Sequence, residues 1–181
     1  MAFGDKKLEG GHAASHASSE QLPILAAPGS GKEKNTIRME LVAVRNGVRF
    51  INDSKASTMS ALAAAVGSGS SKKHLIAGGI LKERDVNFVK EILAENCAYV
   101  YCIGQAAQKL VAAWSDTVQC EDVGQLDVAV RMASERARSG EDVLLSPGCS
   151  SFDQFTSYAQ RGEKFKQCVQ QCTDETITRK T

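Results

Sequence analysis

Residues 46–57 read NGVRFINDSKAS and combine a turn, a strand and a polar cluster in one short stretch. Asn46-Gly47 is the dipeptide most typical of a two-residue hairpin turn. It joins a β-rich run at 39–44 (MELVAV) to a second run at 48–51 (VRFI). The stretch therefore predicts an antiparallel hairpin, with polar residues 52–57 at the end of its second strand.

Beyond this hairpin, strand-like and helix-like segments alternate along the chain. We expect strands at 74–77, 98–103, 117–120 and 143–146. We expect helices at 57–66, 86–93, 105–114, 123–138 and 153–172. Gly140 is the expected C-cap of the helix at 123–138. Such alternation favours a mostly parallel sheet that is covered on both faces. The predicted fold is α/β and Rossmann-like, with about six strands, helices on both faces and an antiparallel edge hairpin.

Charge and apolar runs exclude several classes of function. Lys and Arg number 22 and Asp and Glu number 21, so the net charge of +1 provides no field for nucleic acid or an anionic membrane surface. No apolar run approaches the roughly 20 residues of a membrane-spanning helix. The six cysteines form no CxxC pair, and only Cys168 and Cys172 approach metal-ligand spacing. We therefore expect no metal site and interpret the thiols as small core residues in a reducing compartment.

Residues 1–36 differ from the rest of the chain, because no hydrophobic period is sustained there. We interpret them as a flexible or partner-ordered extension, and residues 37–181 as one domain. The segment 28–33 (PGSGKE) suggests a phosphate-binding loop, but Ala26 and Glu33 stand where that motif needs Gly and Ser or Thr. GxGxxG is also absent, which disfavours a dinucleotide-binding module.

Three polar clusters fall at the ends of predicted strands: NDSKAS at 52–57, GGILK at 78–82 and SPGCSSFD at 146–153. In open α/β sheets, ligands bind beyond the carboxyl ends of the strands. Each cluster alone could be a loop with a helix cap. Together, with two lysines and many small residues, they favour an anion-binding pocket.

The motif NDSKA at 52–56, the pattern SPxCxSxDQF at 146–155 and the run QRGEKF at 160–165 carry a family resemblance. From about residue 38 to residue 168 the chain resembles the C-terminal domain of the Mur ligases. The resemblance implies a domain of an ATP-dependent ligase that adds D-glutamate to UDP-N-acetylmuramoyl-L-alanine in peptidoglycan precursor synthesis. In that reaction the acid is phosphorylated to an acyl phosphate and the amine then attacks it.

The resemblance also implies residue roles. Arg38 and Asp53 would hold the ribose and adenosine side of ATP, and Lys55 would be the catalytic lysine that reaches the substrate or phosphate region. The amino-acid ligand would be held by Ser57, Lys82, Ser151, Phe152 and Tyr158. Glu83 departs from the family pattern, and we expect it to neutralise part of the Lys82 charge.

The family's N-terminal and central domains have no counterpart in this sequence. ATP and Mg²⁺ therefore belong to the complete ligase, and we expect this chain alone to be inactive, with weak binding of D-glutamate and ATP and no tightly bound cofactor. One hypothesis is a ligase domain that works with the missing domains. The alternative is a non-catalytic Mur-ligase-like subunit of a larger, possibly organellar, assembly. We expect a cytoplasmic location, or a plastid or mitochondrion in a eukaryote.

Overall fold

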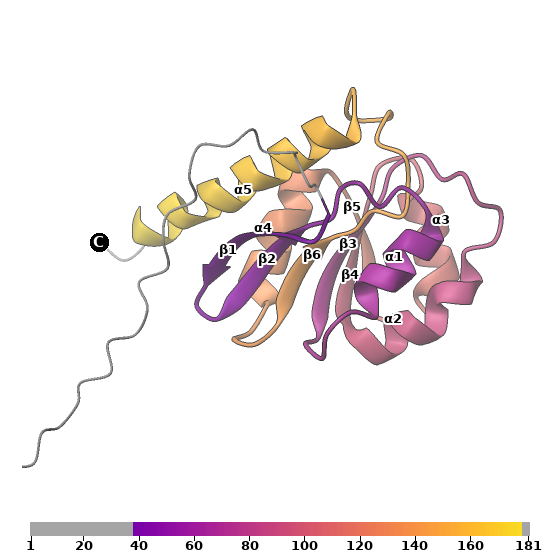
Figure 1. The fold of residues 1–181 in the computed structure, drawn as a ribbon, viewed down its shortest axis with the longest axis horizontal. Helices are drawn as coiled ribbons and strands as arrows, with labels where there is room; N and C mark the ends of the chain where they lie inside the picture. Colours follow the sequence, from indigo (N-terminus) through magenta and orange to yellow (C-terminus); the bar gives the residue numbers. More distant parts are fainter. Residues whose placement is uncertain (1–37, 179–181) are drawn as a thin grey trace, which may run out of the picture. The chain divides into compact units, whose positions relative to one another are not determined.

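The computed structural model of the protein describes residues 38–178, with side chains up to residue 172 (Figure 1). The proposed extension at 1–36 lies outside the described residues. The strands are β1 (Glu40–Arg45), β2 (Val48–Asn52), β3 (Lys73–Gly78), β4 (Cys97–Ile103), β5 (Cys120–Gly124) and β6 (Asp142–Leu145). The helices are α1 (Met59–Val66), a 3₁₀ turn at Asn87–Val89, α2 (Lys90–Asn96), α3 (Ala107–Trp114), α4 (Leu126–Arg136) and α5 (Tyr158–Thr178).

The six strands form one sheet in the order β1-β2-β6-β3-β4-β5. Only the β1–β2 pair is antiparallel, and the four other pairs are parallel. The last strand, β6, lies between β2 and β3, with Asn52 and Ile76 both paired to Leu145. These findings confirm the predicted Rossmann-like sheet with its antiparallel edge hairpin.

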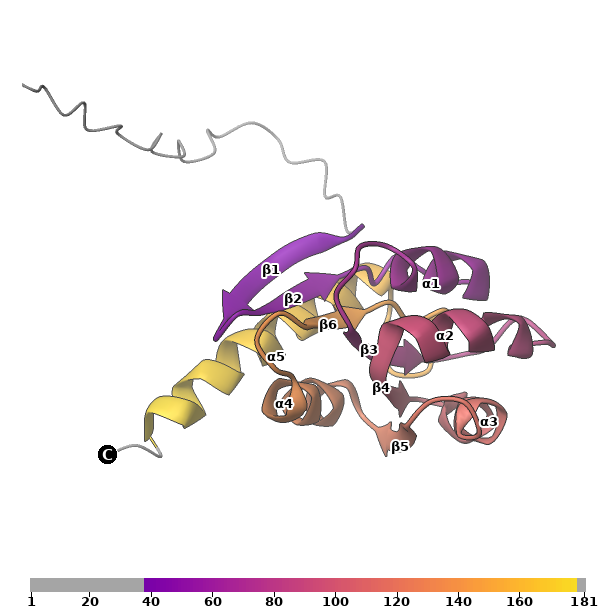
Figure 2. The same cartoon turned by 90° about the horizontal axis from the view of Figure 1, so that it is seen from below.

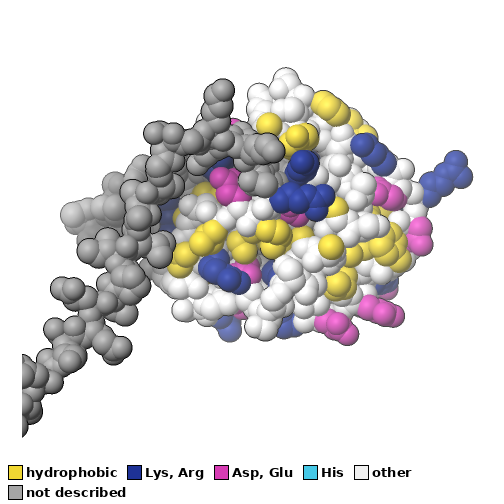
Figure 3. Space-filling view, viewed as in Figure 1, with side chains coloured by type: hydrophobic (Ala, Val, Ile, Leu, Met, Phe, Trp, Pro, Cys, Tyr) yellow, Lys and Arg dark blue, Asp and Glu magenta, His cyan; other side chains and the backbone are white. Residues whose placement is uncertain are grey.

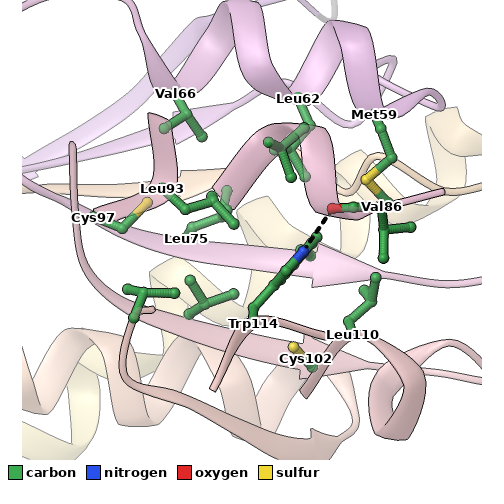
Figure 4. Close-up of a cluster of buried hydrophobic side chains, with 14 of the residues drawn as sticks. Met59, Leu62, Val66, Leu75, Val86, Leu93, Cys97, Cys102, Leu110 and Trp114 are labelled. Carbon is green, nitrogen blue, oxygen red and sulfur yellow. Dashed lines mark hydrogen bonds between the residues drawn. The ribbon is translucent and has the colours of Figure 1, made fainter. Parts of the chain in front are cut away.

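The hydrophobic core divides into two clusters, one on each face of the sheet. Leu75 and Ala77 of β3 face α1, α2 and α3, whereas Ile76 faces α4 and α5, as the period of two in a strand requires. Figure 2 shows these two groups of helices on opposite sides of the sheet. In the first cluster the buried indole of Trp114 donates to the Val86 carbonyl at 2.8 Å, so its one polar atom is satisfied (Figure 4).

The hairpin turn has the backbone conformation that the dipeptide predicts. Asn46 and Gly47 have φ values of 50° and 77°, which is the pair of positive φ angles that a type I′ turn needs. Gly47 also accepts a hydrogen bond from the Gly140 amide at 2.9 Å. Gly140 therefore belongs to the loop after α4, which ends at Ala137, and the expected C-cap at Gly140 is wrong.

The fifth strand lies later in the chain than the β-branched residues Thr117 and Val118 suggest. Their amides donate to the Trp114 carbonyl at 2.9 and 3.0 Å, so they continue the last turn of α3. The strand itself begins at Cys120 and includes two acidic residues. An edge strand tolerates such charges because its outer side need not be covered. The hydrophobic pattern of the sequence therefore places this strand too early in the chain.

The final helix begins at Tyr158 rather than Asp153. The Asp153 carboxylate accepts from the Gln105 amide at 3.0 Å, which holds residues 151–155 in turns over the sheet edge. The Ser157 hydroxyl then accepts from the Gln160 amide at 3.1 Å, as an N-cap side chain does. Similarly, Thr58 rather than Ser57 caps α1, with Oγ1 accepting from the Ala61 amide at 3.2 Å.

A polar chain centred on the buried His74 joins the amino end of β3 to the middle of β4 and to the residue just before β6. His74 Nε2 lies 3.0 Å from Oε2 of Glu141, and His74 Nδ1 lies 3.0 Å from the Tyr101 hydroxyl. The Glu141 carboxylate accepts, so Nε2 carries the proton and Nδ1 accepts from the tyrosine. Burial lowers the pKa of His74, and the nearby carboxylate only partly opposes this effect.

We predict that this histidine makes the protein sensitive to mild acid. Because its folded-state pKa lies below the ordinary value of 6.5, the unfolded chain binds the proton first as the pH falls. The free energy of unfolding should be constant above about pH 7 and should fall below about pH 6.5. Urea unfolding at pH 7.5 and 5.5 measures this, and the non-titrating variant His74→Gln should show a smaller difference between the two pH values. An equal difference in both proteins would contradict the prediction.

Candidate functional site

The strand order brings the three polar clusters to adjacent positions. They follow β2, β6 and β3, which are neighbours in the sheet, so all three lie at one edge. The loops are also bonded to one another: Gly148 donates to Ala56 at 2.9 Å, and Ile80 and Ser150 exchange two backbone hydrogen bonds at 2.8 and 2.9 Å. The clusters therefore form one continuous loop surface.

Arg161 of α5 ties the first loop to the third. Its guanidinium donates to the hydroxyl and carbonyl of Ser54, at 2.9 and 2.8 Å, and to the carbonyl of Cys149 at 3.1 and 3.2 Å. The Ser54 hydroxyl in turn donates to the Tyr158 carbonyl at 2.8 Å. Burial lowers the pKa of Arg161 to about 10, so the side chain, which is 1% exposed, remains a cation at neutral pH.

Asp53 lies beneath the surface at the end of β2. Its Oδ2 accepts from the Ser146 hydroxyl at 3.1 Å, whereas its Oδ1 is buried and has no partner among the described residues. Burial raises the pKa of this carboxyl group, and the Ser146 hydroxyl, the Met39 backbone and the positive charge of Arg38 oppose the rise. Asp53 can therefore accept one further hydrogen bond from a donor such as a hydroxyl group.

Two other carboxylates occupy helix starts at this edge. Glu83 accepts from the Met59 amide at the start of α1 at 3.1 Å, and Asp153 accepts from Gln105 just before α3. Each has a second oxygen that is buried without a described partner. Helix starts in α/β folds commonly bind phosphate, but here the chain's own carboxylates take these amides. The positive charge for an anionic ligand must come from side chains.

The structure places the predicted site residues on this loop surface with differing exposure. Lys55 is exposed in the turn that the Ala56 amide closes on the Asp53 carbonyl at 2.9 Å, and Lys82 is exposed on the second loop. The side chains of Phe152 and Tyr158 are also exposed, by 70% and 44%. Of the other predicted site residues, Arg38 is exposed, Ser57 is half-buried and Ser151 is buried. Figure 3 shows lysine and arginine side chains standing out above hydrophobic side chains that lie over β1 and β2.

The expected neutralisation of Lys82 by Glu83 is wrong. The Glu83 carboxylate turns toward the start of α1 and makes no ion pair with Lys82. Glu83 therefore caps α1, and the Lys82 ammonium has no carboxylate partner among the described residues.

Three residues that build the site lay within the quoted clusters and motifs but received no role of their own from the sequence: Arg161, Gly79 and Asp153. Arg161 stands in the QRGEKF run, where a helical arginine ordinarily faces solvent. Gly79 has a φ of 127°, and a Cβ there would lie 2.1 Å from the Ser150 carbonyl oxygen. The consecutive glycines at 78–79 were the available signal, because paired glycines mark a close backbone approach.

Metal-ligand clusters and membrane-spanning helices are both absent from the described residues. In this part of the chain, no group of three or more His, Cys, Asp or Glu residues could hold a metal ion. No helix among residues 38–178 is long and apolar enough to cross a membrane. Cys149 lies in the core under the loops, where burial raises its pKa to about 12, so it is protonated at neutral pH.

The fold and its loops define a Rossmann-like α/β domain with three polar loops at the carboxyl ends of β2, β6 and β3, the edge where open α/β sheets commonly bind ligands. The family model described as "Mur ligase, glutamate ligase domain" matches residues 37–149. The chain belongs to the Mur ligase family.

Curated relatives extend the match. Proteins named UDP-N-acetylmuramoylalanine--D-glutamate ligase from Pelodictyon phaeoclathratiforme and Acidobacterium capsulatum are 40% and 42% identical over 134 and 132 residues, covering 74% and 73% of this chain. The protein of the same name from Solibacter usitatus is 41% identical over 157 residues, 87% of the chain. The matched region is 29% of the first two relatives and 35% of the third, so the chain spans about a third of their length or less.

Two solved structures share the fold. A bifunctional folylpolyglutamate synthase/dihydrofolate synthase from Yersinia pestis superposes with a TM-score of 0.51 and 19% identity, covering 71% of this chain and 30% of that chain. A murein peptide ligase from Psychrobacter arcticus has a TM-score of 0.50 and 11% identity, covering 77% of this chain and 29% of that chain. At this level of identity the similarity concerns the fold alone.

Proposed function

We propose that this chain is the amino-acid-binding domain of an ATP-dependent ligase that adds D-glutamate to UDP-N-acetylmuramoyl-L-alanine. The observation that carries the proposal is the joining of the NDSKA and SPxCxSxDQF loops, through Arg161, into one surface with two exposed lysines. The names of the relatives support the choice of substrates. The ligase needs the further domains that make those relatives longer.

The loop surface suits a dicarboxylate amino acid. In this proposal Lys82 and Ser57 hold one carboxylate, and Ser151 contributes a contact from the opposite loop. Phe152 and Tyr158 form the exposed aromatic wall that limits the water around the ligand. Lys55 belongs to the first loop, and in this proposal its charge would stabilise the negative charge that develops at the reacting carboxyl group.

The nucleoside part of ATP fits the same edge. The unpartnered Oδ1 of Asp53 provides an acceptor for a ribose hydroxyl, and Arg38 lies close enough to act on the charge of that carboxylate. When bound, ATP supplies the phosphoryl group that activates the acid. The described residues hold no phosphate loop and no metal-ligand group, so the phosphates and Mg²⁺ would be held by another domain.

A binding measurement tests the proposal directly. We expect D-glutamate to cause saturable changes in the amide NMR spectrum of the full chain, centred on residues 54–57, 80–83 and 150–152. Removing the ammonium in Lys82→Ala should raise the dissociation constant for D-glutamate at least about tenfold, because a charge-assisted hydrogen bond contributes roughly 1.5–3 kcal/mol.

The matched control is Lys72→Ala, which removes an exposed lysine just before β3, at the opposite end of the sheet. It should leave the D-glutamate affinity unchanged. If D-glutamate does not bind, or if both variants weaken it equally, the ligase proposal fails. Native mass spectrometry of the chain from its source then decides whether it is a subunit of a larger assembly without ligase partners.

A further inference from the structure

A cavity opens at the amino ends of the strands, at the opposite end of the sheet from the loop surface described above. Its volume is about 590 Å³, which lies in the range of small-molecule pockets. The lining residues are His74, Ala98, Tyr99, Gln119, Arg136, Arg138 and Glu141. They come from the starts of β3 and β4, the segments before β5 and β6, and the end of α4. The proposed ligase function uses none of these residues.

One lining residue, Arg136, has a guanidinium whose orientation is fixed by its neighbours. Arg136 lies over the ring of Tyr99 with 4.6 Å between its central carbon and the ring centroid. It also pairs with Glu121 at 3.2 Å, and the Tyr99 hydroxyl donates to the same carboxylate at 2.8 Å. These contacts fix the guanidinium in orientation, and they raise the pKa of Arg136 against the opposing effect of desolvation. A ligand would therefore meet a cation that loses little further freedom on binding.

One wall consists of groups whose hydrogen bonds are already made. His74 uses both ring nitrogens, one on Glu141 and one on Tyr101. The same Glu141 oxygen accepts from the Arg138 backbone amide at 2.8 Å. The Glu141 charge is thus held by donors of the protein on its inner side, and the Arg138 charge acts on it as well.

The rim carries the donors that remain available. Arg138 is exposed just beyond the end of α4, and its guanidinium makes no hydrogen bond or ion pair with another described residue. Its backbone is fixed by the bond to Glu141, so the side chain starts from a defined position. Gln119 is also exposed, and its carboxamide adds a second donor just before β5.

We propose that this amino-end cavity binds the oxyanion group of a small organic molecule, a carboxylate or a phosphate. Arg138 offers a planar pair of N–H donors that matches either group, and the guanidinium of Arg136 and the carboxamide of Gln119 line the same cavity. The aromatic ring of Tyr99 is covered by Arg136, so the cavity recognises charge rather than a stacked ring.

A titration of the full chain tests this site without reference to ligase activity. Inorganic phosphate and succinate are added separately at pH 7, with sodium chloride adjusted to hold the ionic strength constant. We expect saturable amide shifts around Gln119, Arg138 and Glu141, and the anion with the lower dissociation constant identifies the chemical class. Arg138→Gln should weaken binding at least about fivefold, whereas Arg138→Lys, which keeps the charge but not the planar fork, should weaken it less.

Arg131→Gln is the control, because it removes an exposed arginine from α4, the helix just before Arg138, and Arg131 lies outside this cavity. It should leave the affinity unchanged, and Lys82→Ala should do the same. The proposal is overturned if chloride alone produces the same shifts, if neither anion saturates, or if Arg131→Gln and Arg138→Gln weaken binding equally. Because Lys82 lies at the opposite end of the sheet, the two binding proposals can fail separately.

Discussion

Replacing Gly79 with alanine is expected to cost about 2–6 kcal/mol of the stability of the domain. A Cβ at this position would lie 2.1 Å from the Ser150 carbonyl oxygen and 3.3 Å from the Cys149 side chain. The φ of 127° adds strain for any side chain, roughly 1–3 kcal/mol, and the forced separation of the loops adds a similar amount. The residue cannot move aside, because its amide donates to the Ile103 carbonyl and its own carbonyl accepts from Ala106.

The control for this substitution is Gly69→Ala. Gly69 also has a positive φ, 68°, but a Cβ there would meet nothing within 4 Å. It should cost only about 1–2 kcal/mol, the strain of the left-handed conformation alone. Chemical denaturation of both variants separates the cost of the close approach from the cost of the backbone conformation. Equal losses would show that Gly79 is kept for its φ and not for the contact between the second and third loops.

Replacing Arg161 with methionine is expected to lower the stability by about 3 kcal/mol and the melting temperature by about 10 °C. Methionine fills part of the volume but leaves the Ser54 and Cys149 carbonyls without their donor, and an unsatisfied buried group costs about 1–3 kcal/mol. The variant also no longer pays the desolvation penalty of a buried guanidinium, which offsets part of this loss. Thermal unfolding measured by circular dichroism gives the shift.

The matched control is Arg131→Met, the same change at an arginine that is half-exposed on α4. It should alter the stability by less than about 0.5 kcal/mol. Arg161→Met should also weaken D-glutamate binding while the protein is still folded, because Ser54 and Cys149 would no longer hold the first and third loops together. A variant that loses stability but keeps its full affinity would show that Arg161 supports the fold without positioning the site.

The positions of the three polar clusters were predictable, because each follows a strand in an alternating α/β pattern. Their motifs are also specific enough to identify the family from the residues alone. The detailed contacts were less predictable. Glu83, next to Lys82 in sequence, suggested local neutralisation, yet its carboxylate caps α1 through the Met59 amide 24 positions earlier. Adjacent residues share a loop without sharing a contact, since the backbone can direct their side chains apart.

Element boundaries failed where particular hydrogen bonds outweighed the preference of the residue types. Thr117 and Val118 favour a strand by composition, but hydrogen bonds to Trp114 hold them in the last turn of α3. Asp153 begins a helical pattern, but its bond to Gln105 delays α5 until Tyr158. The partner of Asp153 lies 48 positions earlier in the chain, outside the window in which hydrophobic periodicity can be read, whereas Trp114 lies only three and four positions before Thr117 and Val118.

The amino-acid sequence by itself determined the hairpin at Asn46-Gly47, the alternation of strands and helices, and the motif residues that mark the family. These depend on backbone preference and side-chain period, which act over a few residues. Only the tertiary structure decided that β6 inserts between β2 and β3, that Arg161 ties two loops beneath the surface, and that Arg138 lines a cavity at the amino ends of the strands. Those features depend on which faces are buried against one another, because long-range packing sets the order of strands and the partners of buried charges.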